Sequence, residues 1–436
     1  IGIKTDRFNK LITNKIDQKK NIKLELKTVS FKLDFKELSL FIETAKPKIS
    51  YNNLYIPAEN IKVYIDFFAL IKTDLKIKKI NLVLKEIDII ELNKLSKLIK
   101  PSNFKNYLNN KISEGKLISE IEIFFNDSSK IDSYIIKGNV RSLKANILSN
   151  VNLRKTNFNF FADKEDVLIK NIYGTMDGMK ISDGDIRLNF EKGIKLVSNF
   201  NSDIDLDEKV FYKYNKLLSK YNLEDRIKLL AGNFSNNLSL NFDDTYKLQN
   251  YDYNLSGKLK KSNFLLAKSI KNDLINDEIK ELSFIETQIK SNLSPTSFKI
   301  SGIGKYSLDN SNFLDFKIDN NFSNNLLKIN ANFDFKNDFN LNLINYKKSK
   351  EKIANFAFEI EKKNNLINFK KLNYNEGNNS IKLLGLQLKG NELVSFKKID
   401  IETLNNNFSI KWDKKILIKG TKFDATYLPK LLNKQN

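Results

Sequence analysis

Apolar and charged residues alternate along much of this chain, and the period of the alternation is two. The segment 22–35 reads I-K-L-E-L-K-T-V-S-F-K-L-D-F, and similar alternation returns at 61–67, 75–84, 117–123 and 195–205. Successive side chains of a β-strand point to opposite faces of a sheet, so each such segment predicts a strand with one apolar and one solvated face. The pattern therefore predicts a mainly β chain.

Glycine and proline usage indicates how these strands are arranged. Glycines recur within or just after apolar strand residues, as at Gly138, Gly174, Gly302 and Gly385, whereas the chain has only 5 prolines. A glycine inside a strand marks a bulge or a bend. We therefore expect an elongated, curved antiparallel β-sheet that folds like a taco shell over a continuous apolar interior and forms a long hydrophobic groove, with short helices capping or interrupting it.

Apolar residues at helical spacing interrupt the strand pattern at several places. The organisation that we expect is a lead-in amphipathic helix at 1–20, a β region at 21–115 with a helical cap at 91–112, a β meander at 116–206, a helical insertion at 207–231, and a continuing β-groove at 232–436 with a helical stretch near 265–281.

The composition is that of a folded protein. Of the 436 residues, 41% are hydrophobic and 29% are charged. No stretch approaches the roughly 18 consecutive apolar residues of a transmembrane helix. Because the sequence begins at Ile1 rather than at Met, we expect it to be a segment of a longer protein whose membrane anchor precedes Ile1.

The chain contains neither cysteine nor histidine. This excludes thiolate nucleophiles, disulfides, histidine-containing zinc sites and imidazole general bases. Asp203, Asp205 and Asp207 share one face of a predicted strand, which we interpret as a solvated face. We expect a protein that is not an enzyme, with no catalytic residues, no metal and no cofactor.

The formal charge of +22 raises the question of nucleic acid, but the basic residues do not favour it. Only five of the 74 are arginine, the residue best suited to bidentate phosphate and guanine contacts. Many lysines alternate with apolar residues, as in Ile61-Lys62-Val63, so we interpret them as the solvated face of the sheet. Weak attraction to anionic lipid headgroups, about 1 kcal/mol per well-placed lysine, is a more plausible use of the excess charge.

Four short phrases resemble those of AsmA-like proteins. Residues 63–70 match V-x-I-D-x-x-x-L, and residues 77–82 match the I-x-x-I-x-L that follows it in that family. Residues 172–181 are similar to the recurrent I-x-G-x-x-x-G-x-x-I, and residues 420–425 to G-x-x-x-D-A. In this order the phrases resemble the AsmA, TamB and YhdP group of bacterial envelope bridge proteins, although the richness in Lys and Asn departs from better-known members.

The resemblance implies a location and a function. Members of this group are anchored in the inner membrane by an N-terminal helix and project a curved β-groove into the periplasm, where its apolar lining carries phospholipid acyl chains toward the outer membrane. It therefore implies a periplasmic lipid-transport protein of a Gram-negative envelope that supports outer-membrane homeostasis. The partners of such a protein would be phospholipids and the inner membrane. The resemblance does not decide whether outer-membrane components are partners as well.

A lipid conduit requires a continuous apolar lining. A phospholipid with about 30 methylenes would expose on the order of 20 kcal/mol of apolar surface in water, at about 0.8 kcal/mol per methylene. The alternating positions that we expect to line the groove are Leu24, Leu26, Phe31, Leu33, Val63, Ile65, Phe67, Ile121, Ile123, Leu196, Phe333, Phe335, Leu383, Phe408 and Ile410. Alternation alone does not distinguish an open groove from an ordinary closed core.

Two other functions fit a β-rich chain of this kind. The first is a surface or secreted adhesin-like protein that binds glycans or proteins, which exposed aromatic clusters on the solvated face would favour. The second is an assembly factor for outer-membrane proteins that acts by β-augmentation, for which open edge strands would be the signature.

Overall fold

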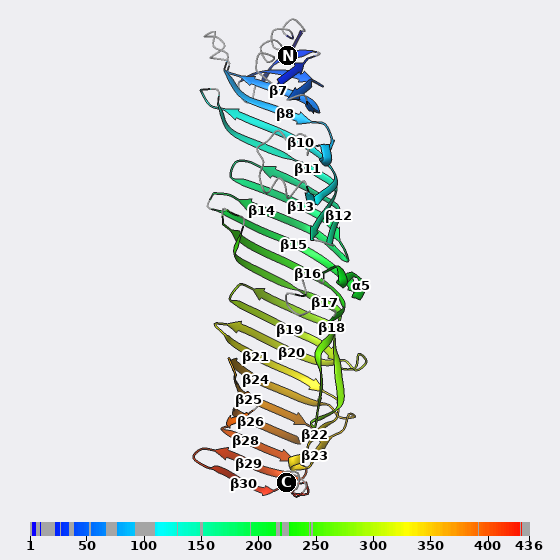
Figure 1. The fold of residues 1–436 in the computed structure, drawn as a ribbon, viewed down its shortest axis with the longest axis vertical. Helices are drawn as coiled ribbons and strands as arrows, with labels where there is room; N and C mark the ends of the chain where they lie inside the picture. The colour runs from blue at the N-terminus through cyan, green and yellow to red at the C-terminus, as the bar shows by residue number, and fades with distance from the viewer. Residues whose placement is uncertain are drawn as a thin grey trace. The chain divides into compact units, whose positions relative to one another are not determined.

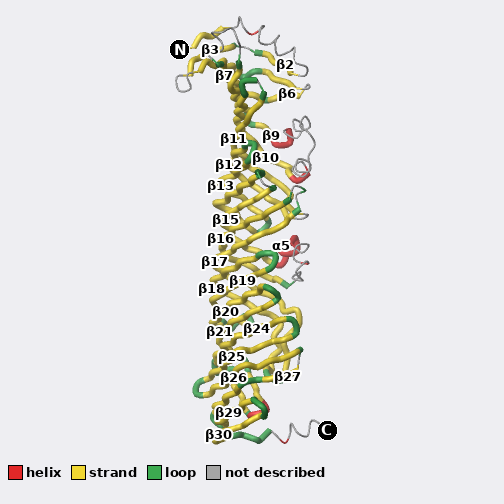
Figure 2. The backbone as a smooth tube through the Cα atoms, turned by 90° about the vertical axis from the view of Figure 1, so that its left-hand side faces the viewer, coloured by secondary structure: helices red, strands yellow, loops and turns green. Residues whose placement is uncertain are grey.

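The computed structural model confirms a mainly β chain with few helices. It describes residues 2–5, 9, 22–26, 28–34, 39–51, 54–66, 76–91, 110–128, 130–148, 151–191, 193–214, 219, 226–243, 245, 247–390, 392–427 and 429. Strands dominate throughout this part of the chain, as the yellow segments of Figure 2 show.

The chain divides into two compact units. Unit 1 comprises residues 1–201 and 239–249, and unit 2 comprises residues 202–238 and 250–436. Each unit is built on its own run of antiparallel strands, in which most strands pair with their neighbours in sequence.

Unit 1 is a meander that begins at β1, and its strands pair in the order β1, β3, β4, β7, β8, β10, β11, β12, β13 and β14. The short strand β9 also pairs with β10, next to β8. Its strands are β1 (Gly2–Thr5), β3 (Val29–Asp34), β4 (Ser39–Ala45), β7 (Ala58–Ile65), β8 (Ile77–Leu84), β9 (Ile87–Asp88), β10 (Ile112–Phe125), β11 (Ile131–Leu148), β12 (Val151–Ala162), β13 (Asp166–Met176) and β14 (Met179–Asn189). A separate small sheet holds β2 (Ile22–Glu25), β5 (Lys48–Tyr51) and β6 (Leu54–Ile56).

Unit 2 contains a second meander, in which β17 to β21, β24 to β26 and β28 to β30 pair in chain order. Its strands are β18 (Ile275–Leu293), β19 (Ser297–Ser307), β20 (Leu314–Ser323), β21 (Leu326–Phe335), β24 (Ala354–Lys363), β25 (Leu366–Glu376), β26 (Asn379–Lys389), β27 (Glu392–Ser395), β28 (Lys398–Thr403), β29 (Asn406–Trp412) and β30 (Ile416–Lys422). Three further strands contribute residues to both units: β15 (Ile194–Asp207), β16 (Ile227–Phe242) and β17 (Leu248–Asn272).

Two segments of unit 2 depart from the meander. The outer part of the β17–β18 hairpin, residues 266–279, is here called the strap; it runs beside the strands that follow it in Figure 1. The connection between β21 and β24, residues 336–353, is called the flap and holds β22 (Phe339–Leu341), the 3-10 turn η3 (Asn342–Ile344) and β23 (Tyr346–Lys348). Strap and flap meet where the backbone N–H of Asn340 donates to the carbonyl of Leu274 at 2.9 Å.

The helical stretch predicted near 265–281 is wrong. These residues form the strap, with Ile270 opposite Ile279 and Asn272 opposite Ile275. The carboxamide of Asn272 accepts hydrogen bonds from the backbone N–H groups of Leu274 and Ile275, which closes a turn of the kind that Asn favours. Pairing between the two arms of the hairpin outweighs the apolar spacing that suggested a helix.

The other predicted helices are only partly realised. In the 207–231 insertion, α5 (Glu208–Phe211) and η1 (Tyr212–Tyr214) are helical, but the prediction is wrong from residue 227, where β16 begins. In the 91–112 cap, residues 91 and 110–111 are helical, Ile112 already belongs to β10, and 92–109 lie outside the described residues. In the 1–20 lead-in, residues 2–5 are a strand and not a helix, and most of the remainder is not described.

Candidate functional site

The sheet of unit 2 has one apolar face, formed by two rows of directly opposed side chains. The first row is Ile289, Gly302, Ile318, Ala331, Phe358, Leu372, Leu383, Ile399, Ile410 and Ile418. The second row is Phe316, Phe333, Phe356, Tyr374, Ile381, Ile401 and Phe408. The rows lie two residues apart on every strand that they share, so they line the same face.

The positions between these two rows point to the opposite face and are mostly polar. From β20 to β30 this intervening row is Lys317, Asn332, Ala357, Asn373, Lys382, Asp400, Ser409 and Lys419. The segregation is the period-two pattern of the sequence, repeated strand after strand in register. It gives unit 2 one solvated face and one apolar face.

Part of the apolar face forms an open pocket of about 380 Å³. Its walls come from β15 to β20 and are Ile204, Leu230, Phe234, Leu255, Leu259, Phe264, Phe284, Thr287, Ile289, Ile300, Ser301, Gly302, Phe316 and Ile318. Among the described residues that line it, Thr287 and Ser301 alone have polar side chains, and the Thr287 hydroxyl donates to the carbonyl of Ile285 at 3.0 Å. This pocket offers almost nothing to a polar ligand and suits a hydrocarbon chain.

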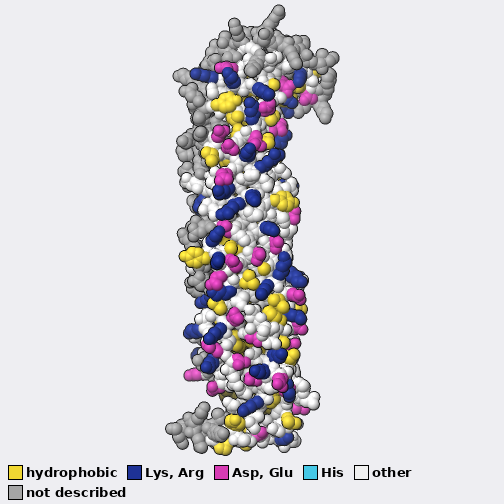
Figure 3. Space-filling model, turned by 90° about the vertical axis from the view of Figure 1, so that its right-hand side faces the viewer, with side chains coloured by type: hydrophobic (Ala, Val, Ile, Leu, Met, Phe, Trp, Pro, Cys, Tyr) yellow, Lys and Arg dark blue, Asp and Glu magenta, His cyan; other side chains and the backbone are white. Residues whose placement is uncertain are grey.

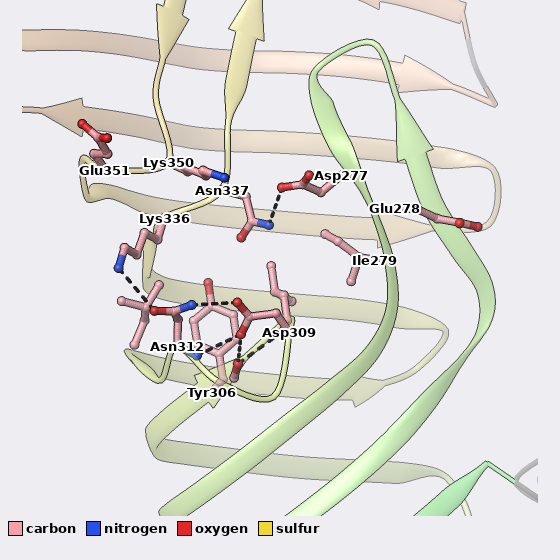
Figure 4. A pocket seen from close by; sticks show the side chains of 13 residues that line it. Asp277, Glu278, Ile279, Tyr306, Asp309, Asn312, Lys336, Asn337, Lys350 and Glu351 are labelled. Atoms are coloured by element: carbon pink, nitrogen blue, oxygen red, sulfur yellow. Dashed lines mark hydrogen bonds between the residues drawn. The ribbon is translucent and has the colours of Figure 1, made fainter.

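A second, polar cavity of about 670 Å³ lies between the strap and the end of the β19–β20 hairpin (Figure 4). Asp277 of the strap accepts a hydrogen bond from the Asn337 carboxamide at 3.1 Å, which closes one side. On the other side Asp309 accepts from the backbone N–H groups of Ser311 and Asn312, both at 2.9 Å. Burial alone would raise the pKa of Asp309, but these bonds outweigh it and hold the pKa well below the ordinary value, so this carboxylate serves as a loop anchor.

The flap covers a further part of the apolar face. Ile344 and Tyr346 are 4% and 7% exposed and form one hydrophobic cluster with Tyr374, Ile401 and Phe408 of the second row. Burying a side chain of this size stabilises the fold by about 1.5–3 kcal/mol. The flap therefore covers the part of the second row that lies beyond the open pocket.

Polar contacts hold the flap at its margins. Tyr346 donates to the carboxylate of Glu376 at 2.8 Å, and Asn406 donates to the carbonyl of Ile344 at 2.9 Å. Burial by itself raises the pKa of Glu376, but hydrogen bonds from Tyr346, Lys352 and Asn379 outweigh it and set the pKa below the ordinary value. Glu376 is therefore an ionised acceptor under the flap.

Lys348 fixes the flap from within. Its side chain is 2% exposed, and Nζ donates to the carbonyls of Lys336, Asn337 and Ser349 at 2.9, 2.9 and 3.1 Å. Burial lowers the pKa of Lys348, against the opposing effect of Asp338 and Glu376. All three ammonium protons are used inside the flap, so this lysine is structural.

In unit 2 the predicted lining residues lie on the apolar face. Leu383 and Ile410 belong to the first row, and Phe333 and Phe408 to the second. Phe335 lies two residues beyond Phe333 on β21 and is 5% exposed. Phe316, Ile318, Phe358 and Tyr374 also line this face but are not among the predicted residues, although the alternation in L-D-F-K-I and N-F-A-F-E-I is a signal for the first three.

In unit 1 the predicted residues also share a face. Phe31 pairs with Ile42, Ile42 with Val63, Val63 with Ile80 and Ile80 with Ile123, which forms one apolar row. Other predicted residues lie two positions from this row along their strands, and therefore on the same face. Leu33 and Ile65 both pair with Leu40, and Ile121 lies opposite Leu82 and Ile136. Leu33 is 41% exposed, whereas Ile65 is 3% exposed, so burial along this face is uneven.

The remaining predicted positions add little. Leu196 is half-buried in β15, and Leu26 is half-buried just after the end of β2. Leu24 lies in β2, opposite Ile49, but its side chain is outside the description, and Phe67 is outside the described residues altogether.

Oppositely charged side chains lie close together in both units. On the face shown in Figure 3, basic and acidic side chains are interspersed. Ion pairs within the described residues include Arg187 with Asp166 at 2.6 Å and Lys370 with Glu361 at 2.6 Å. Asp203 and Asp205 are exposed, and Asp207 caps α5 by accepting from the N–H of Val210 at 2.9 Å. Within the described residues, no group of three or more acidic side chains has the geometry to hold a metal ion.

None of the helices in the described part of the chain has the length and hydropathy of a transmembrane span. In the comparisons with known proteins, no family model, no curated protein and no solved structure matches the chain.

Proposed function

We propose that this chain is a lipid carrier of the bacterial envelope, and that the apolar face of unit 2 holds phospholipid acyl chains. The observation that carries the proposal is the pocket beside Phe316 and Ile318, which joins two long apolar rows and has almost no polar lining. A hydrocarbon chain needs continuous apolar contact and no hydrogen bonds. An open face of this kind meets both conditions.

The cellular setting belongs to the same proposal. The phrases at 63–70, 77–82, 172–181 and 420–425 resemble those of AsmA-like bridge proteins. On that basis the chain works in the periplasm, is anchored to the inner membrane, and carries phospholipid toward the outer membrane. The apolar face of unit 1 would offer a lipid-contacting surface of its own.

The test is native mass spectrometry with lipid extraction on protein purified from a Gram-negative periplasm. Ile318→Asp places a charge in the pocket, and Lys317→Asp changes the adjacent residue on the opposite face of the same strand. We expect co-purifying phospholipid in the wild type and in Lys317→Asp, and at least a tenfold loss in Ile318→Asp. A folded wild-type protein that contains no lipid and takes up no labelled phospholipid would overturn the proposal.

One observation favours the assembly-factor alternative. Among the described residues β30 pairs with β29 alone, and every residue of β30 is exposed, with Ile418 at 63%. A strand with a free edge can accept another strand. A photo-crosslinking probe at Leu417 that captures unfolded outer-membrane barrel protein, with a probe at Leu384 in β26 as control, would support this function; its failure to capture any would remove it.

A further inference from the structure

The flap covers a surface of the same chemistry as the open pocket. The second row runs without a break from Phe316 through Phe333 to Phe356, where the flap begins to cover it. Phe333 stacks on Phe356 with ring centroids 5.5 Å apart. The covered stretch is therefore a continuation of the lining of the pocket.

Exposure changes along this row at the flap. Phe316 and Phe333 are partly exposed, whereas Tyr374, Ile401 and Phe408 are 1%, 9% and 8% exposed. The groups that cover them are apolar side chains of the flap, including Phe339, Leu341 and Ile344. The chain itself thus occupies the place that a hydrocarbon ligand would take.

The flap is built as a separable piece. Its two strands pair only with each other among the described residues, through three residues each. A two-stranded hairpin is marginal by itself, so its position depends on its contacts with the sheet and the strap. Beneath it, β21 and β24 pair directly up to Phe335 opposite Ala354, so the sheet is complete without the flap.

We propose a second, cryptic acyl-chain site beneath the flap, formed by the stretch of the two rows from β24 to β29 and occupied by the flap in the closed form. When the flap lifts, a hydrocarbon chain in the open pocket gains a longer continuous track. This inference rests on the proposed function, because it assigns the same ligand class to the covered part of the same face.

Photo-crosslinking to a phospholipid tests the site. One probe replaces Ile318 in the open pocket and another replaces Ile399, which packs against the cluster under the flap. In the first variant an Asn-Gly turn replaces residues 336–353, since the pair Phe335 and Ala354 leaves a register that a two-residue hairpin can close. We expect lipid labelling at Ile399 to rise at least fivefold in this variant, while labelling at Ile318 stays unchanged.

A second variant keeps the flap and controls its movement. The side chains of Asn276 in the strap and Asn340 in the flap meet at 3.0 Å, and the chain has no other cysteine to interfere. In Asn276→Cys with Asn340→Cys, joined by a short thiol crosslinker, labelling at Ile399 should fall at least fivefold relative to the same protein before crosslinking. This variant does not depend on the flapless protein folding.

The outcomes separate the two proposals. Suppose that lipid labels Ile318, but labelling at Ile399 changes neither when the flap is removed nor when it is locked. This result would overturn the cryptic site and leave the proposed function standing. Absence of lipid labelling at Ile318 in every variant would overturn the proposed function, and the cryptic site with it.

Discussion

The hydroxyl of Tyr346 in the flap lies 2.7 Å from the hydroxyl of Tyr374 on the sheet. Because Tyr346 donates its own proton to Glu376, Tyr374 is the donor in this contact. Burial raises the pKa of Tyr374 to about 12, so both hydroxyls are protonated at neutral pH. This chain of hydrogen bonds links the flap to the face that it covers.

Removing the Tyr346 hydroxyl should therefore loosen the flap. In Tyr346→Phe, Glu376 and Tyr374 each lose a partner in a buried site, which we expect to favour flap opening by about 1–2 kcal/mol. Hydrogen exchange of the flap amides would report this as a rate increase. Tyr253→Phe, which removes a hydroxyl bonded to Asn236 at 2.7 Å outside the flap, should leave these rates unchanged; equal rates in both variants would contradict the prediction.

Acid should loosen the same contact. The pKa of Glu376 is lower in the folded state than in the unfolded chain, so its ionised form contributes stability above the unfolded value of about 4.3, and this contribution is lost as pH falls through the lower folded pKa. We expect the melting temperature of the wild type to fall more steeply below about pH 4.3 than that of Glu376→Gln. Glu392→Gln, an exposed position in β27, should keep the wild-type profile.

Lys348 should be essential to the shape of the flap. Lys348→Met keeps the apolar stem but leaves three carbonyls without their donor, which we expect to lower the free energy of unfolding by about 2–4 kcal/mol. Urea denaturation would measure the loss. The neighbouring Lys347 is exposed, so Lys347→Met should change stability by less than about 0.5 kcal/mol; a similar loss in both variants would show that the buried contacts are not the cause.

Gly302 allows the pocket to be filled without adding charge. The nearest atoms to a Cβ at Gly302 would be side-chain atoms of Phe316 and Ile318, at 3.5 Å or more, so Gly302→Val should fold and take up space in the pocket. We expect it to bind at least threefold less labelled phospholipid, with a circular dichroism spectrum like that of the wild type. Unchanged lipid binding would argue against this pocket as the site.

Gly257 provides the contrasting glycine. A Cβ there would lie 2.1 Å from the carbonyl oxygen of Asn233, so Gly257→Ala should destabilise the sheet by about 2 kcal/mol or more. Thermal unfolding would separate this loss of stability from the loss of lipid binding expected for Gly302→Val.

The sequence by itself determined which residues share a face. Leu383, Ile410, Phe333 and Phe408 were placed on one apolar face by their period of two, and the structure puts them there because side-chain direction in a strand follows from local stereochemistry. The same rule holds for Phe31 and Val63 in unit 1. The long-range partner of a strand does not change which way its side chains point.

Only the tertiary structure decided which apolar segments meet. Residues 266–279 became a strap, and not a helix, because the two arms of the β17–β18 hairpin pair with each other and the strap bonds to Asn340 of the flap. Whether the apolar face is open at Phe316 or covered at Tyr374 depends on the flap, which packs on strands distant from it in sequence. Alternation predicts an apolar face, whereas its covering depends on contacts between segments far apart in the chain.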